Sequence, residues 1–185
     1  AKAMIVGEDF IGCTNRIRPN LNKIKPCNYV SVSAVHFEGY IDYESLIANS
    51  PDVAPNVNVK ERDAWFQIYT SGTMGIPKGV IRSHGSYIAA YLINAVELVL
   101  SEKDYGIIVM PLYHVNSTIY GPLFLFIGAS LFVGRDKNFD PDELLHTMST
   151  ERITFASLIP THYSLILKMP DNVRKKFDLS CVRKL

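Results

Sequence analysis

The sequence predicts an α/β protein in which a layered, mostly parallel sheet is flanked by helices. Short strand-like runs, such as GIIVM at 106–110, are apolar throughout rather than alternating, which is typical of strands buried on both faces. These runs alternate along the chain with helix-like segments, as they do in parallel sheets with crossover helices. A glycine-rich turn directly follows one strand-like run, in a position where α/β proteins bind ligands.

The amino-acid composition excludes several classes of protein. The chain has 185 residues, of which 48% are hydrophobic, enough for a sizeable buried core. With 19 Lys and Arg against 18 Asp and Glu, the net charge of +1 argues against a dedicated nucleic-acid binder. Cys13, Cys27 and Cys181 are odd in number and far apart, so we expect reduced thiols in a cytoplasmic protein.

Residues 1–62 carry the weakest structural signals. The alternating segment 29–35 predicts a strand, and 43–49 a short helix. The prolines and asparagines of 50–59 indicate an exposed connection. We therefore expect an N-terminal strand and helix segment with a linker over 1–62, followed by a second region over 63–185.

The second region begins with a strand, a turn and a helix. Residues 64–70 form a strand-like run, 71–79 a glycine-rich turn, and 80–82 a second short strand. A helix is predicted over 85–100, because apolar residues recur on one face at helical spacing. Ser83 is placed to cap its N-terminus.

A long uncharged run, 105–134, contains the next elements. It predicts an apolar strand at 106–110, a buried helix at 116–127 and a further strand at 129–133. Prolines and glycines interrupt this run, and polar residues at 114–118 lie near its middle. We therefore expect core elements rather than a transmembrane segment.

The last elements have clear start signals. The sequence DPDE at 140–143 combines an Asp cap, a first-turn proline and a glutamate three residues after the cap, which predicts a helix. Residues 153–157 predict a strand, and Pro160 begins a final helix.

The segment 69–80, YTSGTMGIPKGV, concentrates groups suited to polyphosphate. Its glycines let several backbone N–H groups point at one anion, and its hydroxyl groups add donors or a ligand for Mg²⁺. Lys78 supplies a compact positive charge for a phosphate oxygen. The spacing is not that of a Walker A loop, because Pro77 precedes the lysine and a strand is expected to follow. The plainer alternative is a surface β-hairpin with a solvated lysine.

This segment strongly resembles the signature of the adenylate-forming superfamily, which includes acyl-CoA synthetases, aryl-CoA ligases and peptide-synthetase adenylation domains. The family pattern YTSGT[T/S]GxPKGV is matched everywhere except at Met74, which removes one hydroxyl group from the loop. The resemblance covers the chain from about Tyr29 to Leu185. Further family-like segments are Ser83-His84, MPLYH at 110–114, Gly128-Ala129, Phe139-Asp140-Pro141, Pro160-Thr161 and Asp178-Leu179-Ser180.

The resemblance implies a two-step reaction. A carboxylic acid attacks ATP to give an acyl-adenylate and pyrophosphate, and a thiol, usually coenzyme A, then displaces AMP. The implied fold is the N-terminal domain of an acyl-CoA-synthetase-like protein. Thr70 would lie near Mg²⁺. The implied ATP-binding residues are Thr70, Ser71, Gly72, Thr73, Met74, Gly75 and Lys78.

The resemblance also implies an acid-binding pocket along 114–121. His114 would border the acyl group and the adenylate, with Asn116, Ser117, Tyr120 and Gly121 as further candidates. From the residues alone, a core histidine bonded to backbone is the simpler explanation of His114, and a core aromatic that of Tyr120. The apolar surroundings favour a fatty or aromatic acid.

Several family motifs are missing from the sequence, among them the Tyr-Gly-x-Thr-Glu motif and the C-terminal domain with its adenylation lysine. We therefore expect 63–185 to be a partial AMP-binding domain that needs the remaining part of a parent chain and is inactive alone. The start without an initiator methionine agrees with this expectation. The alternatives are an adenylation domain that loads a carrier protein, or a non-catalytic phosphate-binding module.

Overall fold

The computed structural model describes residues 1–70, 76–134 and 139–185, which fall into two compact units, Ala1–Val57 and Asn58–Leu185. The sequence places a boundary slightly later, after residue 62. The difference arises because the end of the predicted linker is bonded into the second unit. The N–H of Gly85 donates to the Glu61 carbonyl at 2.9 Å, and that of His84 to the Asp63 carbonyl at 3.1 Å.

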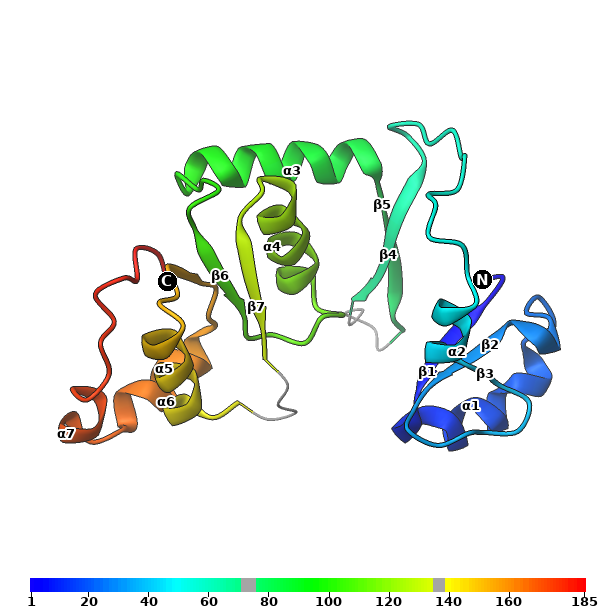
Figure 1. The fold of residues 1–185 in the computed structure, drawn as a ribbon, viewed down its shortest axis with the longest axis horizontal. Helices are drawn as coiled ribbons and strands as arrows, with labels where there is room; N and C mark the ends of the chain where they lie inside the picture. Colours follow the sequence, from blue (N-terminus) through cyan, green and yellow to red (C-terminus); the bar gives the residue numbers. More distant parts are fainter. Residues whose placement is uncertain (71–75, 135–138) are drawn as a thin grey trace. The chain divides into compact units, whose positions relative to one another are not determined.

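The first unit is a small parallel sheet with short helices around it (Figure 1). Its strands run in the order β1-β2-β3. The core is formed by apolar and aromatic side chains, among them Val6, Ile11, Tyr29 and Tyr40. The elements are β1 (Met4–Gly7), η1 (Glu8–Phe10), α1 (Ile11–Ile17), η2 (Arg18–Asn20), η3 (Pro26–Asn28), β2 (Tyr29–Val32), β3 (Ile41–Asp42) and α2 (Tyr43–Ala48).

The second unit begins with an antiparallel pair, β4 (Ala64–Thr70) and β5 (Lys78–Ser83), followed by helix α3 (His84–Glu97). The predicted cap is confirmed, because the Ser83 hydroxyl accepts the N–H of Ser86 at 3.2 Å. The rings of Phe66 and Tyr87, 5.2 Å apart, pack the pair against the helix.

A parallel three-stranded sheet follows, in the order β7-β6-β8. It confirms the parallel topology expected from the apolar runs. Figure 1 shows its strands beside α4 and α5, which lie between them in the sequence. The elements are β6 (Tyr105–Ile108), α4 (Val115–Phe126), β7 (Ser130–Val133), α5 (Pro141–Thr150), β8 (Phe155–Ala156), α6 (Pro160–Lys168) and α7 (Asp171–Arg174).

Helices cover both faces of this sheet, as the apolar strands require. Ile107 packs into one cluster with Leu144 and Met148 of α5. Its neighbour Gly106 points to the opposite face, where a Cβ atom would lie 2.7 Å from the ring of Phe124 in α4. Since successive residues of a strand alternate between faces, α4 and α5 must lie on opposite sides of the sheet.

The uncharged run 105–134 is accounted for by β6, α4 and β7. Leu123 and Phe124 of α4 are fully buried, which confirms the expectation of core elements. Among the residues that the structure describes, no helix combines the length and the apolar character needed to cross a membrane.

Candidate functional site

The ends of β4 and β5 bring two of the predicted phosphate ligands together. Thr70 and Lys78 are direct partners in the antiparallel register, and both are exposed. Partners in such a pair have Cβ atoms about 5 Å apart. The hairpin therefore presents a hydroxyl and an ammonium group side by side. The predicted loop residues Ser71, Gly72, Thr73, Met74 and Gly75 lie outside the described residues.

A second group of predicted residues lies where the parallel sheet ends. His114 is the N-cap of α4 and is exposed, so it is not the core histidine of the simpler explanation. Its Nδ1 accepts the N–H of Asn116 at 3.3 Å. Because Nδ1 accepts, the proton of the neutral ring resides on Nε2, which leaves that atom as the available donor.

Asn116 links the first turn of α4 to the end of β8. Its Nδ2 donates to the hydroxyl of Ser157 at 2.6 Å, and Ser157 directly follows the buried strand β8. Ser157 was not predicted as a site residue. The available signal was a polar residue directly after an apolar strand, since carboxyl ends of parallel strands gather ligands.

The remaining acid-pocket candidates lie deeper along α4. Ser117 is 1% exposed and its hydroxyl donates to the Met110 carbonyl at 2.7 Å. The ring of Tyr120 packs against that of Phe155, with centroids 5.1 Å apart. Gly121 is also buried in the helix. The contacts of Ser117 and Tyr120 hold α4 in place, and direct contact with an acid stays a prediction for all three residues.

His162 is the titratable group of α6 nearest the carboxyl end of β8 in the sequence. It is buried, and its ring stacks on Phe139 with centroids 4.0 Å apart. Its Nδ1 has no hydrogen-bond partner in the described parts of the chain. Burial lowers the pKa of His162, so the ring is held neutral at pH 7.

A separate hollow of about 240 Å³ lies between β4, α3 and α4. Among the predicted site residues that the structure describes, none lines it. Its walls are largely aromatic and apolar, and the side chains are those of Trp65, His84, Tyr87, Ile88, Tyr91, Pro122 and Phe126.

The fold is that of N-terminal domains of adenylate-forming enzymes. An anthranilate CoA ligase in complex with anthranoyl-AMP superposes with a TM-score of 0.85 at 27% identity, covering 98% of this chain and 35% of that one. A structure described as a long-chain-fatty-acid CoA ligase from Rhodopseudomonas palustris gives 0.82 at 19% identity, covering 100% of this chain and 44% of that one.

The chain belongs to the AMP-binding enzyme family, whose pattern it matches over residues 1–185. A long-chain-fatty-acid–CoA ligase of Thermus thermophilus is 30% identical over 86% of the chain, and an indoleacetate–CoA ligase of Aromatoleum aromaticum is 31% identical over 79%. The chain spans 29% and 28% of the length of these two relatives.

Proposed function

We propose that the protein containing this chain is an AMP-forming acid–CoA ligase. It would join a small carboxylic acid to ATP as an acyl-adenylate with release of pyrophosphate, and then pass the acyl group to coenzyme A. The pairing of Thr70 with Lys78 at the ends of the signature hairpin carries this proposal. Membership of the AMP-binding enzyme family supports it.

Thr70 and Lys78 suit the phosphates of ATP. The ammonium group neutralises phosphate charge, and the hydroxyl group donates a hydrogen bond or binds a cation. The described residues hold no cluster of three metal-binding side chains. Mg²⁺ commonly takes most of its ligands from phosphate oxygens and water, and Thr70 would be the ligand that the described residues add.

The carboxyl edge of the parallel sheet is the proposed place of the acid. His114 offers its Nε2 proton there, and the bond between Asn116 and Ser157 fixes the neighbouring surface. We infer a fatty or aromatic acid, because relatives are named for a long-chain fatty acid and for indoleacetate.

We further infer a cytoplasmic protein. Cys13, Cys27 and Cys181 are all within the described residues and all free. Free exposed thiols persist in a reducing compartment.

ATP–pyrophosphate exchange tests the proposal. A protein containing this chain together with the remainder present in its relatives should catalyse exchange with at least one fatty or aromatic acid. Lys78→Ala should lower the exchange rate about 100-fold, since it removes a charge that stabilises the transferring phosphates. Lys175→Ala, at an exposed lysine after α7, is the matched control and should leave the rate unchanged.

The 185-residue chain alone should give no adenylate, since it spans under a third of the relatives' length. Exchange by this chain alone would contradict the expected need for the remaining part. Exchange unaffected by Lys78→Ala would contradict the assignment of the phosphate site. No exchange with any acid by the longer protein would overturn the proposed function.

A further inference from the structure

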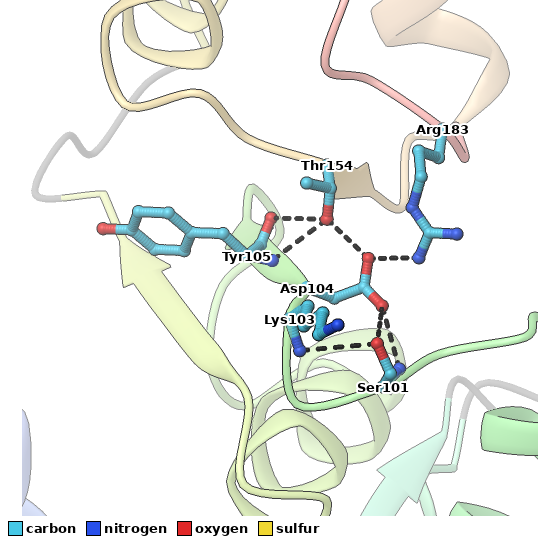
Figure 2. A network of polar contacts seen from close by, with 6 residues as sticks. All are labelled: Ser101, Lys103, Asp104, Tyr105, Thr154 and Arg183. Atoms are coloured by element: carbon cyan, nitrogen blue, oxygen red, sulfur yellow. Dashed lines mark hydrogen bonds and ion pairs between the residues drawn. The ribbon is translucent and has the colours of Figure 1, made fainter.

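Asp104 is buried and is the centre of a polar network at the amino end of β6 (Figure 2). Its side chain is 2% exposed and forms an ion pair with Arg183. It also accepts the hydroxyl of Thr154 at 2.8 Å and the N–H of Ser101 at 2.8 Å. A buried carboxylate with this many donors is fully satisfied only while all of these segments stay together.

The network keeps Asp104 charged. Burial acts to raise its pKa, but the Arg183 guanidinium and the hydrogen bonds from Ser101 and Thr154 outweigh it, so the pKa is lowered. The carboxylate is therefore ionised at neutral pH. Loss of the charge would leave Arg183 without its partner and weaken every bond in the set.

Thr154 carries the network into the sheet. Its hydroxyl accepts the N–H of Tyr105 at 3.0 Å, at the start of β6. Its carbonyl accepts the N–H groups of Arg183 at 2.9 Å and Lys184 at 3.2 Å. Thr154 thus fastens the residue before β8 to β6 on one side and to the segment at 183–184 on the other.

β8 itself is short and depends on its two ends. Its register with β6 consists of two pairs, Gly106 with Phe155 and Ile107 with Ala156. Immediately before it lies Thr154, bonded to Asp104, and immediately after it lies Ser157, bonded to Asn116. A displacement at one end of so short a strand is transmitted to the other, because the ladder contacts that resist it are the two pairs with β6 and one bridge between Phe155 and Lys184.

We propose that Asp104 is a positioning residue for the acid-binding edge, acting through Thr154 and β8 on the hydrogen bond between Ser157 and Asn116. The inference rests on the proposed function for its consequence in the reaction. Its structural part stands on the contacts alone. Asp104 lies at the amino end of β6 and the proposed acid site at the carboxyl edge, so its effect on the acid is indirect.

The structural part is tested on the 185-residue chain by NMR of the Asn116 side-chain amide. In the wild type, this amide should be protected from exchange by its bond to Ser157. Asp104→Asn should reduce the protection at least tenfold, to the level of Ser157→Ala. Thr154→Val, which keeps the ion pair of Asp104 with Arg183, should also reduce the protection of the Asn116 amide. Thr154→Ser, which keeps the hydroxyl group, should show the wild-type protection.

Asp178→Asn is the matched control. It removes a carboxylate from an exposed ion pair with Arg152, and the protection of the Asn116 amide should remain as in the wild type. Full protection in folded Asp104→Asn and Thr154→Val would overturn the inference. If Asp104→Asn does not fold, the result for Thr154→Val alone tests the inference, because that variant keeps the ion pair between Asp104 and Arg183.

The functional part is tested by ATP–pyrophosphate exchange in the longer protein. Asp104→Asn should raise KM for the acid about tenfold while KM for ATP stays within about twofold, as a small misplacement of one edge would produce. In a Ser157→Ala background, the same substitution should add less than about twofold. An equal rise in both KM values, or full additivity with Ser157→Ala, would overturn the inference.

The two tests separate this inference from the proposed function. If the longer protein catalyses no exchange but the Asn116 amide responds to Asp104→Asn, then the proposed function fails and the coupling through β8 stands. If exchange occurs and the amide does not respond, then the coupling fails and the function stands.

Discussion

Gly106 shows how one residue sets the distance between the sheet and its covering helix. A Cβ atom at this position would lie 2.7–2.9 Å from three ring atoms of Phe124, which is fully buried. The ring is enclosed and cannot move aside without disturbing the core. Gly106→Ala should therefore destabilise the second unit by about 1–3 kcal/mol. Urea unfolding, monitored by the fluorescence of Trp65, measures this change in the free energy of unfolding.

Gly121 supplies the matched control within the same interface. A Cβ atom there would meet Leu131 and Ile108 at 3.8 and 3.9 Å, which are ordinary contacts. Because alanine also favours a helix by about 1 kcal/mol over glycine, Gly121→Ala should be neutral or stabilising. Equal destabilisation by both substitutions would contradict the close approach at Gly106.

At the scale of single residues, the sequence predicts chemistry better than contacts. The strand pattern predicted strands at 64–70 and 80–82 on either side of a turn, but it placed Lys78 in the turn; the pairing of Lys78 with Thr70 appears only in the structure, where β5 begins at Lys78. The bond between Asn116 and Ser157 joins residues 41 positions apart, so it depends on the packing of α4 against β8. No local pattern encodes such a pairing.

At the scale of elements, helix starts were predictable and some helix ends were not. Asp140 caps α5, since its carboxylate accepts the N–H of Asp142 at 2.9 Å. The helix predicted to reach residue 100 ends at Glu97, where Val99 adopts φ 50° and the N–H of Leu100 bonds back to Ala95. This is the usual left-handed helix end, but without glycine it has no sequence signal.

The first unit illustrates a second limit on prediction. β1 and α1 were not predicted, although β2 and α2, which are not longer, were predicted, so length alone does not explain the difference. Their stability comes from packing around Tyr29 and Tyr40, which are distant in sequence from both elements. Short elements of this kind are defined by the core they join.

Helix α6 is held at its start by a ring stack instead of a side-chain cap. Burial lowers the pKa of His162 below its ordinary 6.5. Just below pH 6.5, His162 is therefore protonated in the unfolded chain but still neutral in the folded chain. Stability from this group is complete above pH 6.5 and is lost as the pH falls below it. The loss can reach about 1.4 kcal/mol per pH unit.

His162→Phe keeps the ring against Phe139 and removes the titration. Urea unfolding of the second unit between about pH 7.5 and 5.5 should show a shallower loss of stability for this variant than for the wild type. His146→Gln, at an exposed histidine of α5, is the control and should keep the wild-type slope. An unchanged slope in His162→Phe would show that His162 does not contribute to the acid sensitivity.

At the scale of the whole molecule, α3 is apolar on more than its buried face. Tyr87 and Tyr91 are buried, while Ile88, Leu92 and Val96, spaced four residues apart, are 43%, 52% and 76% exposed. A helix that is apolar on two sides is normally covered on both. Exposed apolar stripes of this kind favour association with another surface.

The 185-residue chain should therefore self-associate as its concentration rises, because contact between copies removes the apolar stripe from water. Sedimentation velocity across a concentration series should show a rising average mass for the wild type. The double substitution Leu92→Glu and Val96→Glu places two charges in the stripe and should keep the chain monomeric. Val53→Glu, at a side chain 72% exposed in the connection after α2, should associate like the wild type. A wild type that stays monomeric at every concentration would contradict the assignment of the stripe as an associating surface.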